Sequence, residues 1–318
     1  MDKKIHLIWQ TPEGIQNLYE REYLTDYVFS ETEHDFRVDE AKYSLVMDCS
    51  VVIYSCNSPD APRELKRYLR EFRRKKCRFA LFHLSNECLA HSYGYARHAA
   101  RIFRNYYDPR LTGKNITFVP LGFQSGFLNH SHATLEASER LHAFAFIGQF
   151  SKTEDRMQLA DYLQHRRDCF IHATNAWNCP TSLGVSECRE VYQRTRFVPC
   201  PKGWAHPDSF RIMESLECGA VPILKRYGDT DYFDKVWGSS PLPKVDSWEE
   251  LDHYHDMDSD AYRALHGTVM NWYGQFRDDY PKRVRATLHS LFSEGTQRPS
   301  MPAFLRGLFL LRSRNGRA

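Results

Sequence analysis

Short apolar runs alternate with amphipathic stretches along most of the chain. Runs of β-branched and aromatic residues, typical of buried parallel strands, occupy residues 5–10, 50–55, 78–84, 116–121, 141–147, 169–173, 197–200 and 221–224. Apolar positions at spacings of three and four, which predict helices, mark residues 62–76, 93–104, 156–166, 185–193, 209–218 and most of 248–292. This alternation predicts an α/β fold with parallel sheets covered by helices.

A polar stretch rich in Ser and His, residues 124–139, interrupts this alternation. The chain has 318 residues, which is room for about two domains. We therefore expect one α/β domain at residues 1–135, a second at 136–265, and a helical tail at 266–318.

Composition narrows the class of protein. Hydrophobic residues make up 42% and charged residues 26%, ordinary globular values that exclude disorder, collagen and coiled coil for the chain as a whole. The net charge of +3 gives no strong preference for polyanions, so no nucleic-acid partner is expected. Aromatic residues reach 14%, which suits either a well-filled core or ring-stacking ligands such as sugars and bases.

Cysteine usage and hydropathy predict a cytoplasmic protein. The nine cysteines are scattered without zinc-site spacing, as expected of buried thiols in a reducing compartment. The first residues lack a signal-peptide pattern, and no window approaches the ~20 apolar residues that span a bilayer.

The stretch 197–224 carries the most informative pattern: strand, loop, helix, tight turn, strand. Asp208 or Ser209 is positioned to cap the helix, and Gly219 to adopt the left-handed conformation at its end. Open α/β sheets bind ligands beyond the carboxyl ends of their strands, and a helix N-terminus there attracts a pyrophosphate. Arg211 and Glu214 share a helical face, which suits a phosphate and a ribose diol, or else a plain surface ion pair.

The segment 143–156 predicts a second strand–loop–helix unit beside it. Ser151 and Glu154 have capping-box spacing. Ser151, Lys152 and Arg156 could all reach a diphosphate, or could simply begin a solvated helix.

These motifs resemble exostosin-like glycosyltransferases of the family 47 type, in particular the branch with ribitol-phosphate xylosyltransferases. The matching positions are Pro201, Gly203, Asp208, Ser209, Phe210, Arg211, Glu214, Cys218, Gly219, Val221, Pro222 and Ile223. Residues 82–87, 103–107 and 118–123 resemble three further family segments, with Asn86 where the family has Asp.

The resemblance implies a GT-B fold, in which two Rossmann-like domains with parallel sheets face a cleft. It implies acceptor binding by the N-terminal domain, nucleotide-sugar binding by the C-terminal domain, anomeric inversion and no resident metal. The donor-binding residues would then be Ser151, Lys152, Arg156, Lys202, Ser209, Phe210, Arg211 and Glu214.

Inversion requires a base for the acceptor hydroxyl, and Glu87, after the strand at 78–84, is our candidate. In the alternative, Ser85 caps a helix and Glu87 complements its dipole, and a third role is acceptor binding. We assign His83 and Arg104 to the acceptor. The alternatives are a packed strand histidine and a structural partner for a carboxylate.

Three short acidic patterns could chelate a metal, at 229–231, 256–258 and 258–260, but such patterns are weakly specific. We expect no metal site and no cofactor. Dinucleotide-fold, P-loop, zinc-protease and hydrolase-elbow motifs are absent from the sequence.

Two basic segments suggest further contacts. The helix at 62–76 carries six cations on one face, either solvated or attracted to an anionic acceptor or membrane. Residues 304, 305, 308 and 311 form an apolar helical stripe among arginines. This tail either packs back on the N-terminal domain or lies in the membrane headgroup plane, on the inner face.

The sequence therefore predicts an inverting glycosyltransferase. It would move a sugar from a nucleotide-sugar, a UDP-sugar in the first instance, to a cell-surface or capsular glycan or a polyol-phosphate, free or lipid-linked. The alternatives are a GDP- or CMP-sugar transferase of the same fold and a non-catalytic nucleotide- or sugar-binding module.

Overall fold

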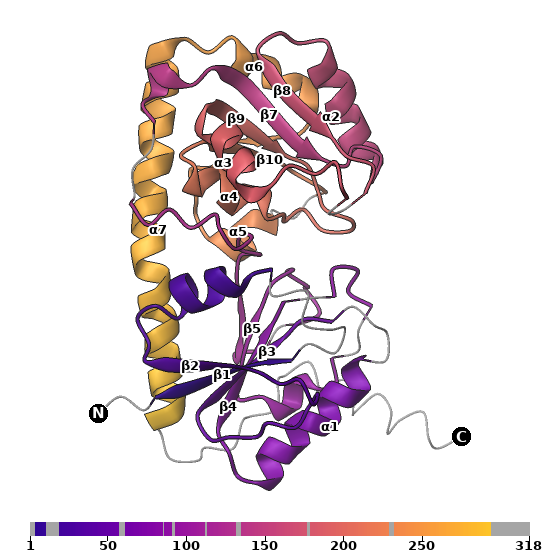
Figure 1. The fold of residues 1–318 in the computed structure, drawn as a ribbon, viewed down its shortest axis with the longest axis vertical. Helices are drawn as coiled ribbons and strands as arrows, with labels where there is room; N and C mark the ends of the chain where they lie inside the picture. Colours follow the sequence, from indigo (N-terminus) through magenta and orange to yellow (C-terminus); the bar gives the residue numbers. More distant parts are fainter. Residues whose placement is uncertain are drawn as a thin grey trace. The chain divides into compact units, whose positions relative to one another are not determined.

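The computed structural model describes residues 4–10, 19–56, 61–84, 86–90, 93–111, 113–131, 135–176, 179–228 and 232–293. They form two compact units (Figure 1). The first unit takes its described residues from 1–18, 28–120 and 280–318, and the second from 19–27 and 121–279. The main segment of the first unit thus stops at residue 120, before the expected boundary at residue 135. The unit also includes the end of the C-terminal helix.

Among its described residues, the first unit has a six-stranded parallel sheet in the order β2-β1-β3-β4-β5-β6. The strands are β1 Ile5–Gln10, β2 His34–Val38, β3 Ser50–Tyr54, β4 Phe79–His83, β5 Arg101–Arg104 and β6 Ile116–Phe118. The register pairs Tyr54 with His83 and His83 with Arg104. Tyr54, His83 and Arg104 are therefore neighbours at the carboxyl ends of three adjacent strands.

Helix α1, Ala61–Arg74, covers this sheet with its apolar face. Leu65, Leu69 and Phe72 are fully buried in a cluster that includes Val52 and Leu81 from the strands. Burying such side chains stabilises the fold by ~1.5–3 kcal/mol each. The cationic face of α1 is left outward.

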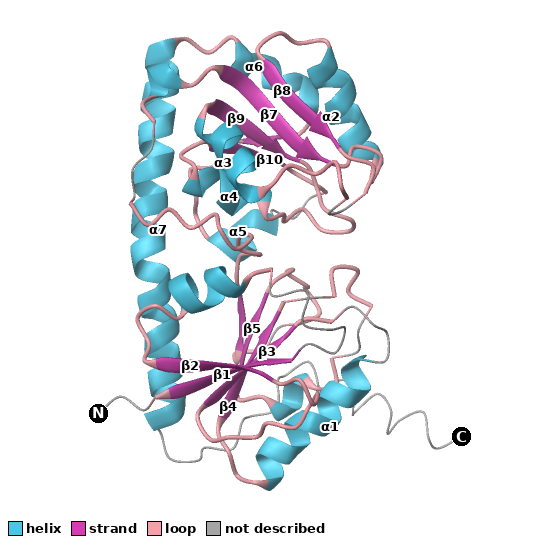
Figure 2. Ribbon diagram, viewed as in Figure 1, coloured by secondary structure: helices cyan, strands magenta, loops and turns pink. Residues whose placement is uncertain are grey.

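The described part of the second unit contains a five-stranded parallel sheet in the order β11-β10-β9-β7-β8, flanked by helices (Figure 2). The strands are β7 His142–Gly148, β8 Cys169–Ala173, β9 Thr195–Cys200, β10 Val221–Lys225 and β11 Lys244–Val245. The helices are α2 Glu154–Gln164, α3 Val185–Gln193, α4 Arg211–Glu217, α5 Tyr232–Trp237 and α6 Leu251–His255. The predicted α/β class with two parallel sheets is confirmed.

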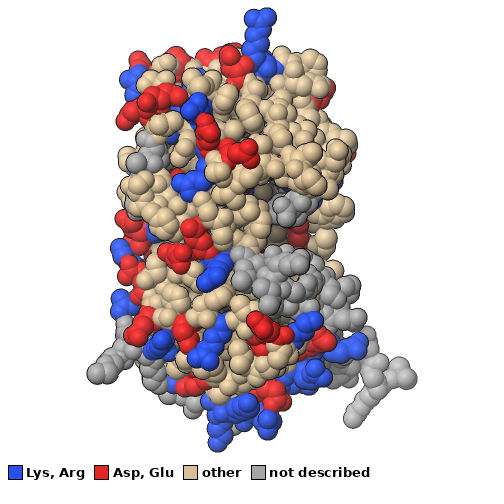
Figure 3. Space-filling view, in the orientation of Figure 1, with Lys and Arg blue, Asp and Glu red and all other residues tan. Residues whose placement is uncertain are grey.

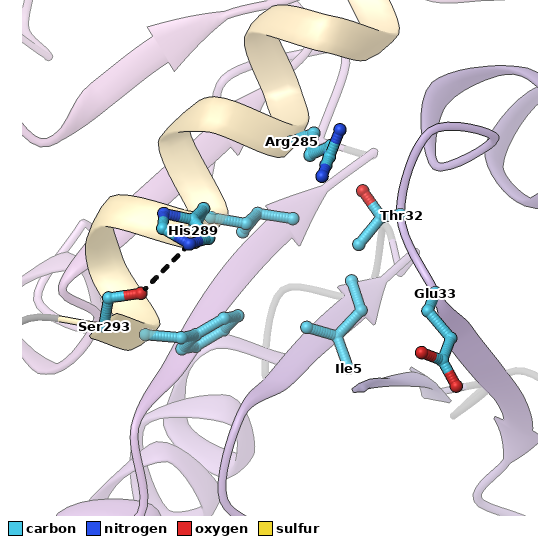
Figure 4. Close-up of a pocket in the computed structure, with 8 residues that line it drawn as sticks. Ile5, Thr32, Glu33, Arg285, His289 and Ser293 are labelled. Atoms are coloured by element: carbon cyan, nitrogen blue, oxygen red, sulfur yellow. Dashed lines mark hydrogen bonds between the residues drawn. The ribbon is translucent and has the colours of Figure 1, made fainter. Parts of the chain in front are cut away.

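Helix α7, Ser259–Ser293, contributes residues to both units and contains Pro281. Its last turns lie beside β1 in the first unit, around a small pocket (Figure 4). Ile5 and Phe292 give the pocket apolar walls, and His289 contacts Ser293 at 3.5 Å. The basic apolar tail of the sequence lies at 294–318, outside the described residues. Within the described residues, every helix is too short or too polar to cross a bilayer.

One predicted element is wrong. The helix expected at 93–104 is a single 3₁₀ turn, Ala96–His98, followed by β5. Ile102 and Phe103 are buried between β4 and β6, and pairing with both neighbours decides the strand. β2 was not predicted because its five residues, half-buried or exposed, lack an apolar run.

Candidate active site

Two loops of the second unit meet at the carboxyl edge of its sheet because β7 and β9 are neighbours. Arg156 donates hydrogen bonds to both loops. Its Nε donates to the Lys202 carbonyl at 2.9 Å, and its Nη1 donates to the Gln149 carbonyl at 3.1 Å. The guanidinium is buried, at 7% exposure. These two bonds hold the guanidinium group of Arg156 at this edge.

The start of α2 differs from the predicted capping box. The N-cap is Thr153, whose Oγ1 accepts a hydrogen bond from the Arg156 amide at 3.4 Å. Ser151 is exposed, and its Oγ accepts from Gln149 at 3.3 Å. The box is therefore wrong, and Ser151 lies at the surface of the loop.

Asp155 connects several elements at this edge, and no local sequence pattern indicates its contacts. Its buried carboxylate accepts hydrogen bonds from Lys225 Nζ at 2.8 Å, Tyr227 Oη at 2.6 Å and Trp248 Nε1 at 3.0 Å. Tyr227 Oη in turn accepts from the Lys202 amide at 2.9 Å. The network fixes the backbone of Lys202. An acid at a helix start is ordinarily explained by the helix dipole, and only the distant partners reveal this role.

Arg211 begins α4 and is held against the end of β7. Its Nη2 donates to the Ile147 carbonyl at 2.9 Å, and its guanidinium carbon lies 4.6 Å from the centre of the Phe146 ring. Gly148 makes room for it: the backbone there has φ 138°, and an added Cβ would lie 3.1 Å from Arg211 Nη2. The charge of Arg211 is therefore fixed at the edge, beside the β7 loop.

The N-terminus of α4 also departs from the prediction. Its N-cap is Phe210, without a side-chain cap. Asp208 instead accepts a hydrogen bond from the Leu121 amide at 3.2 Å, and burial raises the pKa of its carboxyl to about 7. Ser209 Oγ is buried without a hydrogen-bond partner among the described residues. The C-terminal prediction is confirmed, because Gly219 has φ 72° and its amide closes the last turn.

Glu214 lies in the same buried cluster. Its Oε1 accepts a hydrogen bond from the Gln124 amide at 3.2 Å. Burial raises the pKa of its carboxyl to about 7, against the lowering effects of that amide and of Arg211. Tyr19 completes the cluster, with its Oη bonded to Gln124 at 2.6 Å and its ring 5.1 Å from Phe210. Since Glu214 and Arg211 are each only 9% exposed, the surface ion pair alternative is wrong.

An exposed aromatic residue marks the rim of these loops. Trp204 is 61% exposed, and Lys152 Nζ lies 5.8 Å from the centre of its ring. An exposed indole offers a flat apolar surface on which a ring-shaped ligand can stack. Trp204 lies within the motif at 197–224, where its spacing alone indicates no role.

The acceptor candidates lie in the first unit, and two of them are fully buried. His83 Nδ1 is 2.5 Å from Tyr95 Oη, and its ring packs on Tyr54. Arg104 lies 3.5 Å from the Asn86 carbonyl and 5.9 Å from the Tyr93 ring centre. This burial favours the packed-strand alternative for His83, and acceptor binding by either residue stays a prediction.

Glu87 follows β4 in a turn, and its side chain is half-buried. Asn86 adopts φ 71°, and the Leu89 amide closes the turn on the Asn86 carbonyl at 3.0 Å. The helix-capping alternative is wrong, since residues 86–90 form no helix. Glu87 remains a candidate base at the carboxyl edge of the first sheet.

The acidic patterns at 256–258 and 258–260 lie where helix α7 begins. Asp258 caps α7 by accepting from the Asp260 and Ala261 amides at 2.9 and 2.8 Å. The pattern at 229–231 lies outside the described residues. No cluster of metal-binding side chains occurs in the part of the chain that the structure describes.

Comparison with known proteins now places the chain. The family model described as RXYLT1 C-terminal domain matches residues 124–293. The chain belongs to the RXYLT1 C-terminal domain family. The resemblance expected from the motifs is confirmed, and this RXYLT1-family protein is a glycosyltransferase. The matched region includes the Arg156, Arg211 and Glu214 elements, whereas Glu87 lies before it.

Solved structures show the fold of this RXYLT1-family chain. A crystal structure of an α1,3-fucosyltransferase has a TM-score of 0.51 and 11% identity, covering 94% of both chains. Anabaena Alr3699/HepE in complex with UDP and glucose has a TM-score of 0.53 and 9% identity, covering 90% of this chain and 99% of that one. The fold is GT-B. None of the curated proteins matches the chain.

Proposed function

We propose that this protein is an inverting glycosyltransferase whose donor is a UDP-sugar bound at the carboxyl edge of the second sheet. One observation carries the proposal. Two buried hydrogen-bond donors, Ser209 Oγ just before α4 and Arg211 Nε at its start, have no hydrogen-bond partner among the described residues. A buried donor without a partner costs ~1–3 kcal/mol. Phosphate oxygens of a bound nucleotide-sugar would accept hydrogen bonds from both of these groups.

The surrounding charges support a diphosphate. The described loops place Arg156 and Arg211 at this edge, with Lys152 and Lys202 beside them. Charge-assisted hydrogen bonds from guanidinium groups to phosphate are strong and directional. These cations would stabilise the charge that develops on the leaving diphosphate. We therefore propose that activity requires no metal ion.

The rest of the nucleotide would contact the second half of the cluster. The Glu214 carboxylate would accept hydrogen bonds from the ribose hydroxyls. Within the protein it accepts a hydrogen bond from the Gln124 amide and is stabilised by the charge of Arg211. Ser151, between β7 and α2, would add a hydroxyl, and Trp204 and Phe210, between β9 and α4, would add two ring surfaces. The UDP assignment is supported by HepE, whose structures contain UDP and UDP-glucose.

The first unit would supply the base. We propose that the Glu87 carboxylate removes the proton of the acceptor hydroxyl as its oxygen attacks the anomeric carbon. The bond from that carbon to the diphosphate oxygen breaks, and the configuration inverts. The acceptor would be a glycan or a polyol-phosphate, and His83 and Arg104 would contribute to its binding region.

Calorimetric titration with UDP, GDP and CMP, and with their sugar conjugates, tests this assignment. We expect UDP and one UDP-sugar to bind best, and slow hydrolysis of that sugar in the absence of acceptor. Preference for GDP or CMP would support the other transferases of the same fold. Tight binding without any turnover, with a panel of acceptors, would support a binding module and contradict the enzyme.

A further inference from the structure

In the first unit, His98 is held between two arginine side chains. Its Nδ1 lies 3.4 Å from Arg73 Nη1 of α1, and its Nε2 lies 3.4 Å from Nε of Arg97, the preceding residue in the same 3₁₀ turn. The imidazole is 6% exposed, whereas Arg73 is exposed and Arg97 is half-buried. Both ring nitrogens therefore face a guanidinium group.

The two contacts of the His98 ring cannot both be hydrogen bonds. Neutral imidazole has one acceptor nitrogen and one N–H, and guanidinium groups only donate. One of the two contacts must therefore place an N–H against another N–H. Protonating the ring would make both contacts repulsive. Burial, followed by the charges of Arg97, Arg73, Arg70 and Lys66, accordingly lowers the pKa of His98 to about 4.

The cations around His98 form a compact group. Lys66, Arg70 and Arg73 share one face of α1, at spacings of four and three residues. Burial, followed by the charges of Arg97 and Arg70, lowers the pKa of Lys66, as expected where cations gather. Lys and Arg side chains gather at the α1 end of this unit (Figure 3). Arg74, next in sequence, instead pairs with Glu71 at 2.8 Å.

We propose that Arg73 and Arg97, with Lys66 and Arg70 beside them, form a binding site for a phosphate group. Its oxygens would accept hydrogen bonds from both guanidinium groups, which relieves the donor–donor contact at His98. Guanidinium groups suit this ligand because their forked donors match phosphate geometry. The site belongs to the first unit and does not depend on the donor assignment. The phosphate could be carried by a soluble ester or by a lipid headgroup.

The pKa of His98, followed by NMR on the full chain labelled in histidine, is the direct readout. The His98 signal is assigned by its loss in His98→Gln. One arm adds inorganic phosphate at constant ionic strength, and the other adds vesicles of equal parts phosphatidylglycerol and phosphatidylcholine. We expect the bound anion to raise the pKa by about one unit, which by linkage means ~tenfold tighter binding to the protonated ring.

Two neighbouring arginines provide a matched comparison. Arg73→Gln and Arg74→Gln remove the same charge from adjacent positions of the same helix. Arg73→Gln should weaken phosphate binding by roughly tenfold or more, and Arg74→Gln by less than about twofold. A rise in the pKa of His98 that occurs only with vesicles, and is lost in Arg73→Gln, would identify lipid headgroups as the source of the phosphate. No shift in either arm, or equal losses in the two variants, would overturn the site.

Discussion

Arg211 Nη2 donates a hydrogen bond to the carbonyl oxygen of Ile147 at 2.9 Å. The bond joins the first residue of α4 to the end of β7 and fixes a cation at the carboxyl edge of the second sheet. The residue after Ile147 is Gly148, which lies directly under the guanidinium group. The position of the charge thus depends on a glycine.

Gly148→Ala should therefore weaken donor binding. Alanine is strained at φ 138°, by ~1–3 kcal/mol, and its Cβ would lie 3.1 Å from Arg211 Nη2. Thermal unfolding and calorimetric titration with UDP measure the two effects. Gly267→Ala, in α7 with open space around it, is the control and should leave binding unchanged. Wild-type affinity in Gly148→Ala would separate Arg211 from the donor.

Glu214 gives donor binding a pH dependence. The pKa of its carboxyl is raised from 4.5 to about 7, so the carboxylate forms only near neutral pH. Because we assign the ribose hydroxyls to the carboxylate, affinity for a UDP-sugar should increase as the pH rises through about 7. Glu214→Ala should lower affinity by ~1–3 kcal/mol, and Glu214→Gln should bind with little pH dependence. A pH-dependent Glu214→Gln variant would assign the effect elsewhere.

The same burial predicts how stability changes with pH. Glu20, Asp208 and Glu214 each have a carboxyl pKa raised to about 7 by burial. Their folded forms hold a proton that the unfolded chain releases above its lower pKa. The free energy of unfolding should therefore fall as the pH rises from about 4.5 to about 7, and level off above it. Denaturant titrations across this range measure it, and a rise attributable to these groups would contradict their burial.

Local pattern predicted much of this fold and less of the site. Helix α3 and strand β8 have the predicted bounds, because apolar spacing and strand runs decide them. Apolar spacing predicts a helix where β5 forms, since only the pairing with its two neighbouring strands decides the strand. The network of Asp155 draws on Lys225 and Trp248, which no local spacing connects to it. Long-range contacts explain what the sequence could not predict.

Replacing the candidate base should affect turnover alone. We expect Glu87→Gln to lower kcat by ~10²–10⁴-fold, the loss for a missing general base, with UDP affinity nearly unchanged. Steady-state kinetics and calorimetry on the same preparation measure both quantities. Turnover near that of the wild type would return Glu87 to a structural role in its turn.

Metal dependence is tested by chelation. Because Arg156 and Arg211 are assigned to the diphosphate, transfer should continue in excess EDTA. Complete loss of activity, restored by Mn²⁺ or Mg²⁺, would instead direct attention to the acidic pattern at 229–231, which lies outside the described residues.

The central claim is that a nucleotide diphosphate is bound by the partnerless donors of Ser209 and Arg211, and calorimetric titration of UDP into a double variant tests it most directly. In Ser209→Ala/Arg211→Gln, affinity should fall by at least ~2 kcal/mol, the loss of two hydrogen bonds to a charged group. Arg166→Gln removes a surface cation paired with Asp252 and should bind like the wild type. Undiminished UDP binding in a correctly folded double variant would contradict the account.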